Sequence, residues 1–409
     1  MRSGSSNTGS GALWIACVLP VALLAATPIR PLSPQSLFWT APAILLAAML
    51  IAWAAESAQF FIAQGFALAI LAWLQTMPEF AVEAVLAWKQ NVPLLLANLT
   101  GALRLLTGVG WPMIYFTAAM FHRARYKKPL REIALAEGHS IEIAGLLPCM
   151  AYAAVIWWKA SLNRWDAAVL IAIYVAYLLV LRRMPPEAAE SIEDLEFIPR
   201  SIVTARKPVR TGAIAGLFAA GGLLIYFLAE PFLASLLAAS TALGISNFVF
   251  VQWVAPFVSE FPEKVSAFYW ARTIDRASMA LMNMVSSNIN QWTLLAAMLP
   301  IVFSMSVGTP STIHFDARQE IEILMTLGQQ LLGTLFLINM RLRWWEAAAL
   351  FVLWLVQFLL GSVHWSITFV YFAWSAVEVV LVLAGKRKPL ALQSFAALWN
   401  RHVRATAIK

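Results

Sequence analysis

Two Pro-Glu pairs lie inside stretches that are otherwise apolar, and each has further oxygen-bearing side chains close to it. Pro78-Glu79 follows Thr76, and Pro262-Glu263 follows Ser259 and Glu260. Carboxylate, hydroxyl and amide oxygens are the ligands that a hard cation such as Ca²⁺ accepts. A proline also removes a backbone donor, which leaves a carbonyl one turn earlier available. The two stretches therefore predict a binding site for a hard cation.

A second polar group follows each Pro-Glu pair at nearly the same distance. The interval from Glu79 to Asn98 is 19 residues, and the interval from Glu263 to Asn283 is 20 residues. The group in the second half of the chain is the richer one, and its members are Asn283, Ser286, Ser287, Asn288, Asn290 and Gln291. Small polar side chains can also join membrane helices. We favour cation binding or pore lining over helix packing for this group.

Three more charged residues lie in the same stretches. Glu83 lies one helical turn after Glu79, and Lys264 lies four residues after Glu260, a spacing that suits an ion pair on a helix. Glu83 could bind the cation or pair with Arg104. Glu260 could form an ion pair with Lys264, or titrate with it so that a proton replaces a metal ion. Fixed positive charges beside the ligands count against Ca²⁺ as the bound ion.

The composition places these residues in a membrane protein. Hydrophobic residues make up 61% of the 409 residues, charged residues only 12%, and the mean hydropathy is +0.73. Soluble proteins carry about 25% charged residues. An ionisable side chain near the bilayer centre costs about 2.5 to 3.5 kcal/mol. The internal glutamates must therefore be paired, protonated or in contact with water.

Apolar stretches of membrane-crossing length predict about twelve transmembrane helices. They lie at roughly 12–28, 37–55, 57–88, 92–120, 139–158, 165–182, 212–229, 238–270, 276–305, 319–338, 345–361 and 365–384. The first stretch is short enough for a signal peptide, but with a single early cation and no convincing cleavage site it fits a membrane helix better.

The spacing of the Pro-Glu pairs divides the chain into two repeats. We expect an N-terminal tail and extra helix at 1–36, a first repeat at 37–182, a cytoplasmic loop at 183–211, a second repeat at 212–361, and an extra helix with a basic tail at 362–409. Each repeat holds five crossings, and an odd number inserts the second copy upside down. The predicted fold is an all-α polytopic membrane protein with two inverted five-helix repeats and one extra helix at each end.

The distribution of Lys and Arg predicts the orientation. Twelve crossings place 22 of these residues on one side of the membrane and five on the other. The positive-inside rule then puts both termini and the central loop in the cytoplasm, as in a plasma membrane or a bacterial inner membrane. It also accounts for the net charge of +8 without a nucleic-acid partner. The expected partners are the lipid bilayer and transported inorganic cations.

The Pro-Glu pairs with polar groups twenty residues later, in two inverted halves joined by a cytoplasmic loop, resemble the calcium/cation antiporter superfamily, which includes the sodium/calcium exchangers. The resemblance covers about residues 37 to 361, and 283–289 stands where the family has a Gly-Asn-x-x-Gly-Ser-Asn-like sequence. It implies that Glu79 and Glu263 are the central metal ligands. The assisting ligands that it implies are Thr76, Ser259, Ser287 and Gln291.

The first repeat departs from the family pattern. Ala102 and Leu103 stand where the family has Ser and Asn, and Arg104 follows them. In the second repeat Glu260 takes a hydroxyl position. We therefore expect an asymmetric site, in which residues 259–291 supply more of the ligands.

The leading hypothesis is a secondary active cation antiporter of the sodium/calcium exchanger type, working by alternating access. No chemical bond changes in such a cycle, so we expect a transporter and not an enzyme. We expect no cofactor beside the transported Na⁺, Ca²⁺ or H⁺. One alternative is a monovalent cation/proton antiporter on the same fold, in which Arg104 and Lys264 replace part of the bound charge. The other is a non-transporting membrane scaffold whose site is neutralised by internal ion pairs.

Overall fold

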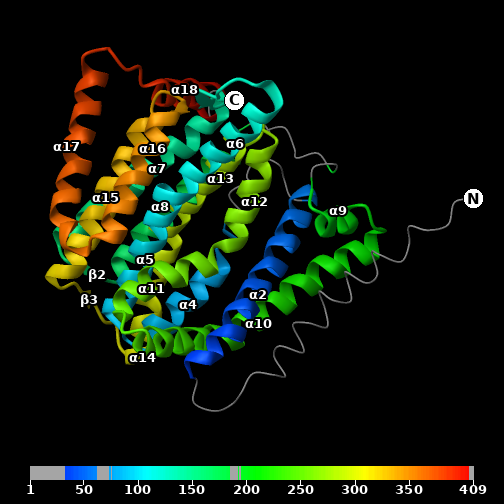
Figure 1. Cartoon of the computed structure of the whole chain (residues 1–409), viewed down its shortest axis with the longest axis vertical. Coiled ribbons are helices and arrows are strands. Elements are labelled where there is room, and N and C mark those ends of the chain that lie inside the picture. The colour runs from blue at the N-terminus through cyan, green and yellow to red at the C-terminus, as the bar shows by residue number, and fades with distance from the viewer. Residues whose placement is uncertain (1–32, 62–72, 75, 185–191, 193–194, 405–409) are drawn as a thin grey trace, which may run out of the picture. The chain divides into compact units, whose positions relative to one another are not determined.

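The computed structural model describes residues 33–61, 73–74, 76–184, 192 and 195–404 (Figure 1). The first predicted crossing, 12–28, lies outside these residues. Seven helices within the described residues are long and apolar enough to cross a membrane, and two shorter apolar helices accompany them. The prediction of a polytopic helical membrane protein is confirmed, whereas the count of about twelve crossings stays a prediction.

The chain divides into two compact units. Unit 1 comprises Met1–Val85 and Pro186–Glu263, and unit 2 comprises Leu86–Pro185 and Lys264–Lys409. The chain passes from one unit to the other inside α4 (Met77–Trp88) and again inside α12 (Phe261–Arg272).

Unit 1 is built around two long helices that run side by side (Figure 1). Its complete helices are α2 (Leu37–Ala58), α9 (Phe197–Val203), α10 (Lys207–Ala242) and α11 (Asn247–Ser259). A Cβ added to Gly221 of α10 would lie 2.7 Å from Ile51 Cγ1 and 3.0 Å from the Ala47 carbonyl oxygen, so only glycine permits this approach. The buried hydroxyls of Thr40 and Ser235 are 2.7 Å apart and link the two helices.

The length of α10 differs from the prediction. The sequence predicts separate crossings at 212–229 and 238–270. The structure joins the first stretch to the start of the second in one helix of 36 residues, with Glu230 exposed, and the rest of the second stretch holds α11 and most of α12. A proline inside a membrane helix is tolerated when local adjustments satisfy the freed carbonyl.

Unit 2 is a larger helix bundle. Its helices are α5 (Val92–Leu105), α6 (Trp111–Tyr126), α7 (Ser140–Trp158), α8 (Arg164–Leu181), α13 (Ala277–Asn290), α14 (Ala296–Val307), α15 (Ala317–Leu337), α16 (Trp344–Leu359), α17 (His364–Leu383) and α18 (Leu390–Leu398). A π-helical turn joins α5 to α6 at Leu106–Gly110, and another joins α13 to α14 at Gln291–Leu295. Helix α15 packs against α5, α7 and α17.

Four short strands in unit 2 pair in a pattern that follows the two repeats. β1 (Glu132–Ala134) pairs antiparallel with β4 (Arg341–Arg343), and β2 (Ser161–Leu162) pairs antiparallel with β3 (Ile313–His314). By order along the chain, β1 corresponds to β3 and β2 corresponds to β4. A two-fold operation that exchanges the repeats therefore converts one strand pair into the other, as expected for inverted repeats.

Candidate functional site

Both Pro-Glu glutamates lie in the first turn of a helix that follows a break. Helix α11 ends at Ser259, Glu260 leaves helical geometry with ψ near 3°, and α12 begins at Phe261. In the first half of the chain Thr76 forms a turn and α4 begins at Met77. The prolines occupy the second position of α4 and α12, where their missing donor costs little. Each proline therefore lies at the start of a new helix and does not kink a continuous helix.

This placement suits buried carboxylates. Glu79, Glu83 and Glu263 are completely buried, and Glu260 is 1% exposed. The N-terminus of a helix carries a partial positive charge that stabilises a nearby anion, which lowers the cost of burying Glu79 and Glu263. Interrupted helices with polar residues at the break are also the way in which transporters build ion sites within the membrane.

The hydroxyls beside these glutamates face their own helical turns. Thr76 Oγ1 donates to the Trp73 carbonyl at 2.9 Å, and Ser259 Oγ donates to the Ala255 carbonyl at 3.0 Å. Both residues are 1% exposed. The Ser259 hydroxyl oxygen keeps lone pairs for a cation, because its bonds to backbone carbonyls use only its proton.

The polar group on α13 is buried in unit 2. Ser286 bonds to the Tyr177 hydroxyl at 3.2 Å, and Asn288 donates to Thr107 Oγ1 at 3.3 Å. Asn288 also accepts from Gln330 at 3.1 Å. These bonds join α13 to α8, to the first π-turn and to α15, so Ser286 and Asn288 have a packing role.

The neighbouring predicted ligands are just as buried. Asn283, Ser287 and Gln291 have no exposed surface. Among the described residues, no hydrogen bond involves Ser287 Oγ. Gln291 opens the second π-turn, and π-turns occur frequently at functional sites.

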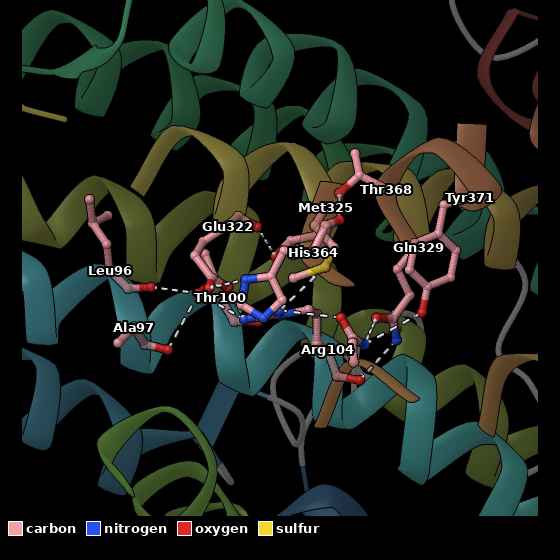
Figure 2. Close-up of polar contacts among 12 residues, drawn as sticks. Leu96, Ala97, Thr100, Arg104, Glu322, Met325, Gln329, His364, Thr368 and Tyr371 are labelled. Atoms are coloured by element: carbon pink, nitrogen blue, oxygen red, sulfur yellow. Dashed lines mark hydrogen bonds and ion pairs between the residues drawn. The ribbon is translucent and has the colours of Figure 1, made fainter. Parts of the chain in front are cut away.

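Arg104 forms a buried ion pair that the sequence analysis did not anticipate. Its Nη2 lies 2.5 Å from Glu322 Oε2, and the two side chains are 0% and 1% exposed (Figure 2). His364 Nδ1 lies 3.2 Å from the other oxygen of Glu322. The three residues belong to α5, α15 and α17.

A closed ring of hydrogen bonds fixes the Arg104 guanidinium. Nη1 donates to Gln357 Oε1 at 3.2 Å, Gln357 donates to Gln329 Oε1 at 2.9 Å, and Gln329 donates back to the Arg104 carbonyl at 3.0 Å. Nε also donates to the Thr100 carbonyl at 3.1 Å. The guanidinium therefore carries several of the bonds that a buried charge requires.

The structure divides the predicted site residues between the two units. Unit 1 holds Thr76, Glu79, Glu83, Ser259, Glu260 and Glu263, and unit 2 holds Arg104, Lys264, Asn283, Ser287 and Gln291. Lys264 is 5% exposed. Sequence reasoning missed Glu322, although an acid inside the apolar stretch 319–338 was a signal that Arg104 had a candidate counterion. Gln357 and Gln329 offered the same kind of signal.

Side chains alone do not form a compact metal cluster in the part of the chain that the structure describes. There, no group of three or more His, Cys, Asp and Glu side chains could hold a metal ion. The predicted ligand set is a mixed one, in which carboxylates combine with hydroxyl and amide oxygens, and hard cations accept such oxygens.

Comparison with known proteins places both repeats in one family. The model of the sodium/calcium exchanger protein family matches residues 33–182 and 213–363. A search of curated protein sequences finds no significant match.

Solved structures with the same fold include several exchangers. The H⁺/Ca²⁺ exchanger CAX aligns with 30% identity and a TM-score of 0.86, over 96% of this chain and 98% of CAX. The sodium-calcium exchanger NCX_Mj aligns with 18% identity and a TM-score of 0.54, over 80% of this chain and 98% of NCX_Mj. YfkE aligns with 14% identity and a TM-score of 0.56, over 85% of this chain and 98% of YfkE. The chain is an integral membrane protein that belongs to the sodium/calcium exchanger family.

Proposed function

We propose that this protein is a secondary active antiporter that exchanges Ca²⁺, or another hard cation, against Na⁺ or H⁺ by alternating access. Glu79 and Glu263 supply the charged ligands in this proposal. Thr76, Ser259, Glu260, Asn283, Ser287 and Gln291 supply further oxygens. The protein binds and releases the ion without changing any chemical bond.

The observation that carries the proposal is the burial of both Pro-Glu glutamates at helix breaks. Two carboxylates with no exposed surface are costly in a membrane protein unless they have a functional or structural counterion. Their equivalent positions, in the first turns of α4 and α12, are expected if both repeats contribute to one cation site. Only a difference in cation affinity between two orientations can drive such a cycle.

The Arg104–Glu322 pair bears on the scaffold alternative. That alternative requires the site carboxylates to serve as counterions for the internal cations. Glu322 already balances the charge of Arg104 at 2.5 Å within unit 2. Glu322 is therefore a counterion of this arginine that lies outside the predicted ligand group.

The coupling ion in this proposal is either Na⁺ or H⁺. The relative with the higher identity is named for H⁺/Ca²⁺ exchange, and the likeness to NCX_Mj concerns the fold. Glu260 lies at the break before α12 and is 1% exposed, so it is the acid that we assign to proton exchange. We further propose that both termini and the central loop are cytoplasmic, as the positive-inside rule predicts.

Uptake into liposomes separates the candidates. Purified protein is reconstituted, and Ca²⁺ uptake is followed under an outward Na⁺ gradient, under an outward H⁺ gradient, and with neither gradient. We expect uptake under one of the two gradients and a baseline signal without them. Collapse of a pH gradient by K⁺ or Na⁺ without any Ca²⁺ flux would identify the monovalent cation/proton antiporter instead. The absence of flux for every ion tested would contradict transport.

A further inference from the structure

A cavity of about 1090 Å³ lies in unit 2 where α6 ends and α16 begins. The loop after α6 closes one side of it. The Tyr115 hydroxyl donates to the Leu130 carbonyl at 2.5 Å, and the Trp344 backbone N–H donates to the Arg131 carbonyl at 3.2 Å. The loop is therefore held in place against both helices, and the cavity is a built feature of unit 2.

The walls of the cavity are of two chemical kinds. Phe116, Met120 and Trp344 supply apolar surface, and their side chains are 44%, 58% and 58% exposed. Arg123 and Lys127 line the cavity at the end of α6, together with Arg131 from the loop. An apolar wall that passes into a cluster of cations matches the boundary between acyl chains and headgroups in a bilayer.

The cations of the cavity have no counterion within the described residues. The nearest acid in sequence, Glu132, binds Arg341 at 3.1 Å and lies 3.8 Å from Arg343. In the described part of the chain, no hydrogen bond or ion pair holds the head groups of Arg123, Lys127 and Arg131. Three positive charges therefore face one cavity with their bonding capacity unused.

We propose that this cavity binds an anionic phospholipid, with the lipid phosphate between Arg123, Lys127 and Arg131 and an acyl chain along Phe116, Met120 and Trp344. Basic pockets on the cytoplasmic side of membrane helices recognise anionic headgroups in this way. The positive-inside rule places this loop on the cytoplasmic side, where anionic lipids are abundant. The lipid site is independent of which ions the protein exchanges.

The basic loop also has simpler explanations, and they do not account for the cavity. Cations at the C-terminus of a helix interact favourably with its dipole. Cations in a cytoplasmic loop also help to orient the protein. Arg125 and Lys128 satisfy both explanations equally well, yet neither lines the cavity. These two residues therefore provide a matched control with the same loss of charge in the same segment.

Lipid binding to the delipidated full-length protein in detergent tests the proposal. Native mass spectrometry compares phosphatidylglycerol with phosphatidylcholine of the same acyl chains. We expect preferential binding of phosphatidylglycerol to the wild type. The R123Q/R131Q variant should bind it about 30-fold more weakly, from the attraction expected of two cations. The R125Q/K128Q variant should stay within about twofold of the wild type.

Two further arms keep the outcome decisive. Met120→Asn leaves every cation in place and should weaken phosphatidylglycerol binding, because it removes apolar contact with the acyl chain. Inorganic phosphate should not displace the lipid at a comparable concentration. Equal losses in R123Q/R131Q and R125Q/K128Q, equal binding of the two lipids, or efficient displacement by phosphate would each overturn the proposal.

Discussion

The Arg104–Glu322 pair predicts a large coupling free energy between two residues that are 218 positions apart in the sequence. The pair is almost completely buried, with side-chain exposures of 0% and 1%. Removing one member of such a pair leaves an uncompensated buried charge, which costs about 3 to 5 kcal/mol. Removing both members leaves no charge, and apolar or neutral replacements for a buried pair are often nearly neutral.

The remaining contacts set the cost of each change. After Glu322→Gln, Arg104 retains the Thr100 carbonyl at 3.1 Å and Gln357 Oε1 at 3.2 Å as acceptors, so we expect the lower end of the range, about 3 kcal/mol. After Arg104→Met, Glu322 retains His364 at 3.2 Å, and we expect about 3 to 5 kcal/mol. The double variant should lose less than about 2 kcal/mol, because only the neutral bonds of the ring are broken.

Reversible unfolding in mixed micelles, followed by tryptophan fluorescence, gives the free energy of unfolding for the four proteins of this cycle. We expect a coupling energy of about 4 kcal/mol or more. Glu320→Gln is the matched control, because Glu320 lies two residues before Glu322 in the same helix and is not buried. It should change stability by no more than about 0.5 kcal/mol. Additive losses in the double variant would refute the structural role assigned to the pair.

Two further substitutions test packing in the two units. Arg387 binds the buried carboxylates of Glu346 in α16 at 2.6 Å and of Glu378 in α17 at 2.5 Å. Arg387→Ala should therefore lower the free energy of unfolding by about 3 kcal/mol or more, because it leaves these charges uncompensated. Lys386→Ala should leave the free energy of unfolding nearly unchanged in the same denaturation assay. Gly221→Ala should lower the melting temperature, because the new Cβ would lie 2.7 Å from Ile51 Cγ1. Gly222→Ala is the control. Its Cβ would meet no atom within 4 Å, so the higher helix propensity of alanine should raise the melting temperature slightly. A lower melting temperature for Gly222→Ala than for Gly221→Ala would contradict the packing described for α2 and α10.

The repeats could be predicted from the sequence because their signals are local. The two Pro-Glu pairs and the polar groups that follow them recur at almost equal spacing, and apolar stretches mark the crossings. The family model matches 33–182 and 213–363, close to the predicted repeats at 37–182 and 212–361. Both observations depend on residues that are near one another in the chain.

The helix breaks were harder to predict. A Pro-Glu pair inside an apolar run indicates a kink or a new helix start equally well, because proline is tolerated in both places. At Glu260 the helix is broken. At Pro231 the helix continues, although Glu230 directly precedes this proline. Helix α10 packs against α2, a contact between distant parts of the chain that local sequence signals do not show.

The partner of Arg104 could not be predicted for a related reason. The sequence analysis considered Glu83 as a partner for Arg104, but helical periodicity identifies neighbours only within one helix, so it could not indicate an acid in α15. The observed partner, Glu322, comes from the other repeat and from a helix that contributes none of the predicted ligands. Such pairings depend on how α5 and α15 pack.

The most direct test of cation exchange is gradient-driven Ca²⁺ uptake by liposomes that contain Glu263→Gln. This change keeps the shape of a side chain that is completely buried but removes its charge. Glu137→Gln serves as the control, because Glu137 is exposed and lies outside every predicted ligand group. We predict that Glu263→Gln abolishes uptake above the no-gradient baseline, whereas Glu137→Gln retains the wild-type rate. Wild-type uptake by Glu263→Gln would contradict the assignment of this carboxylate as a ligand of the transported ion.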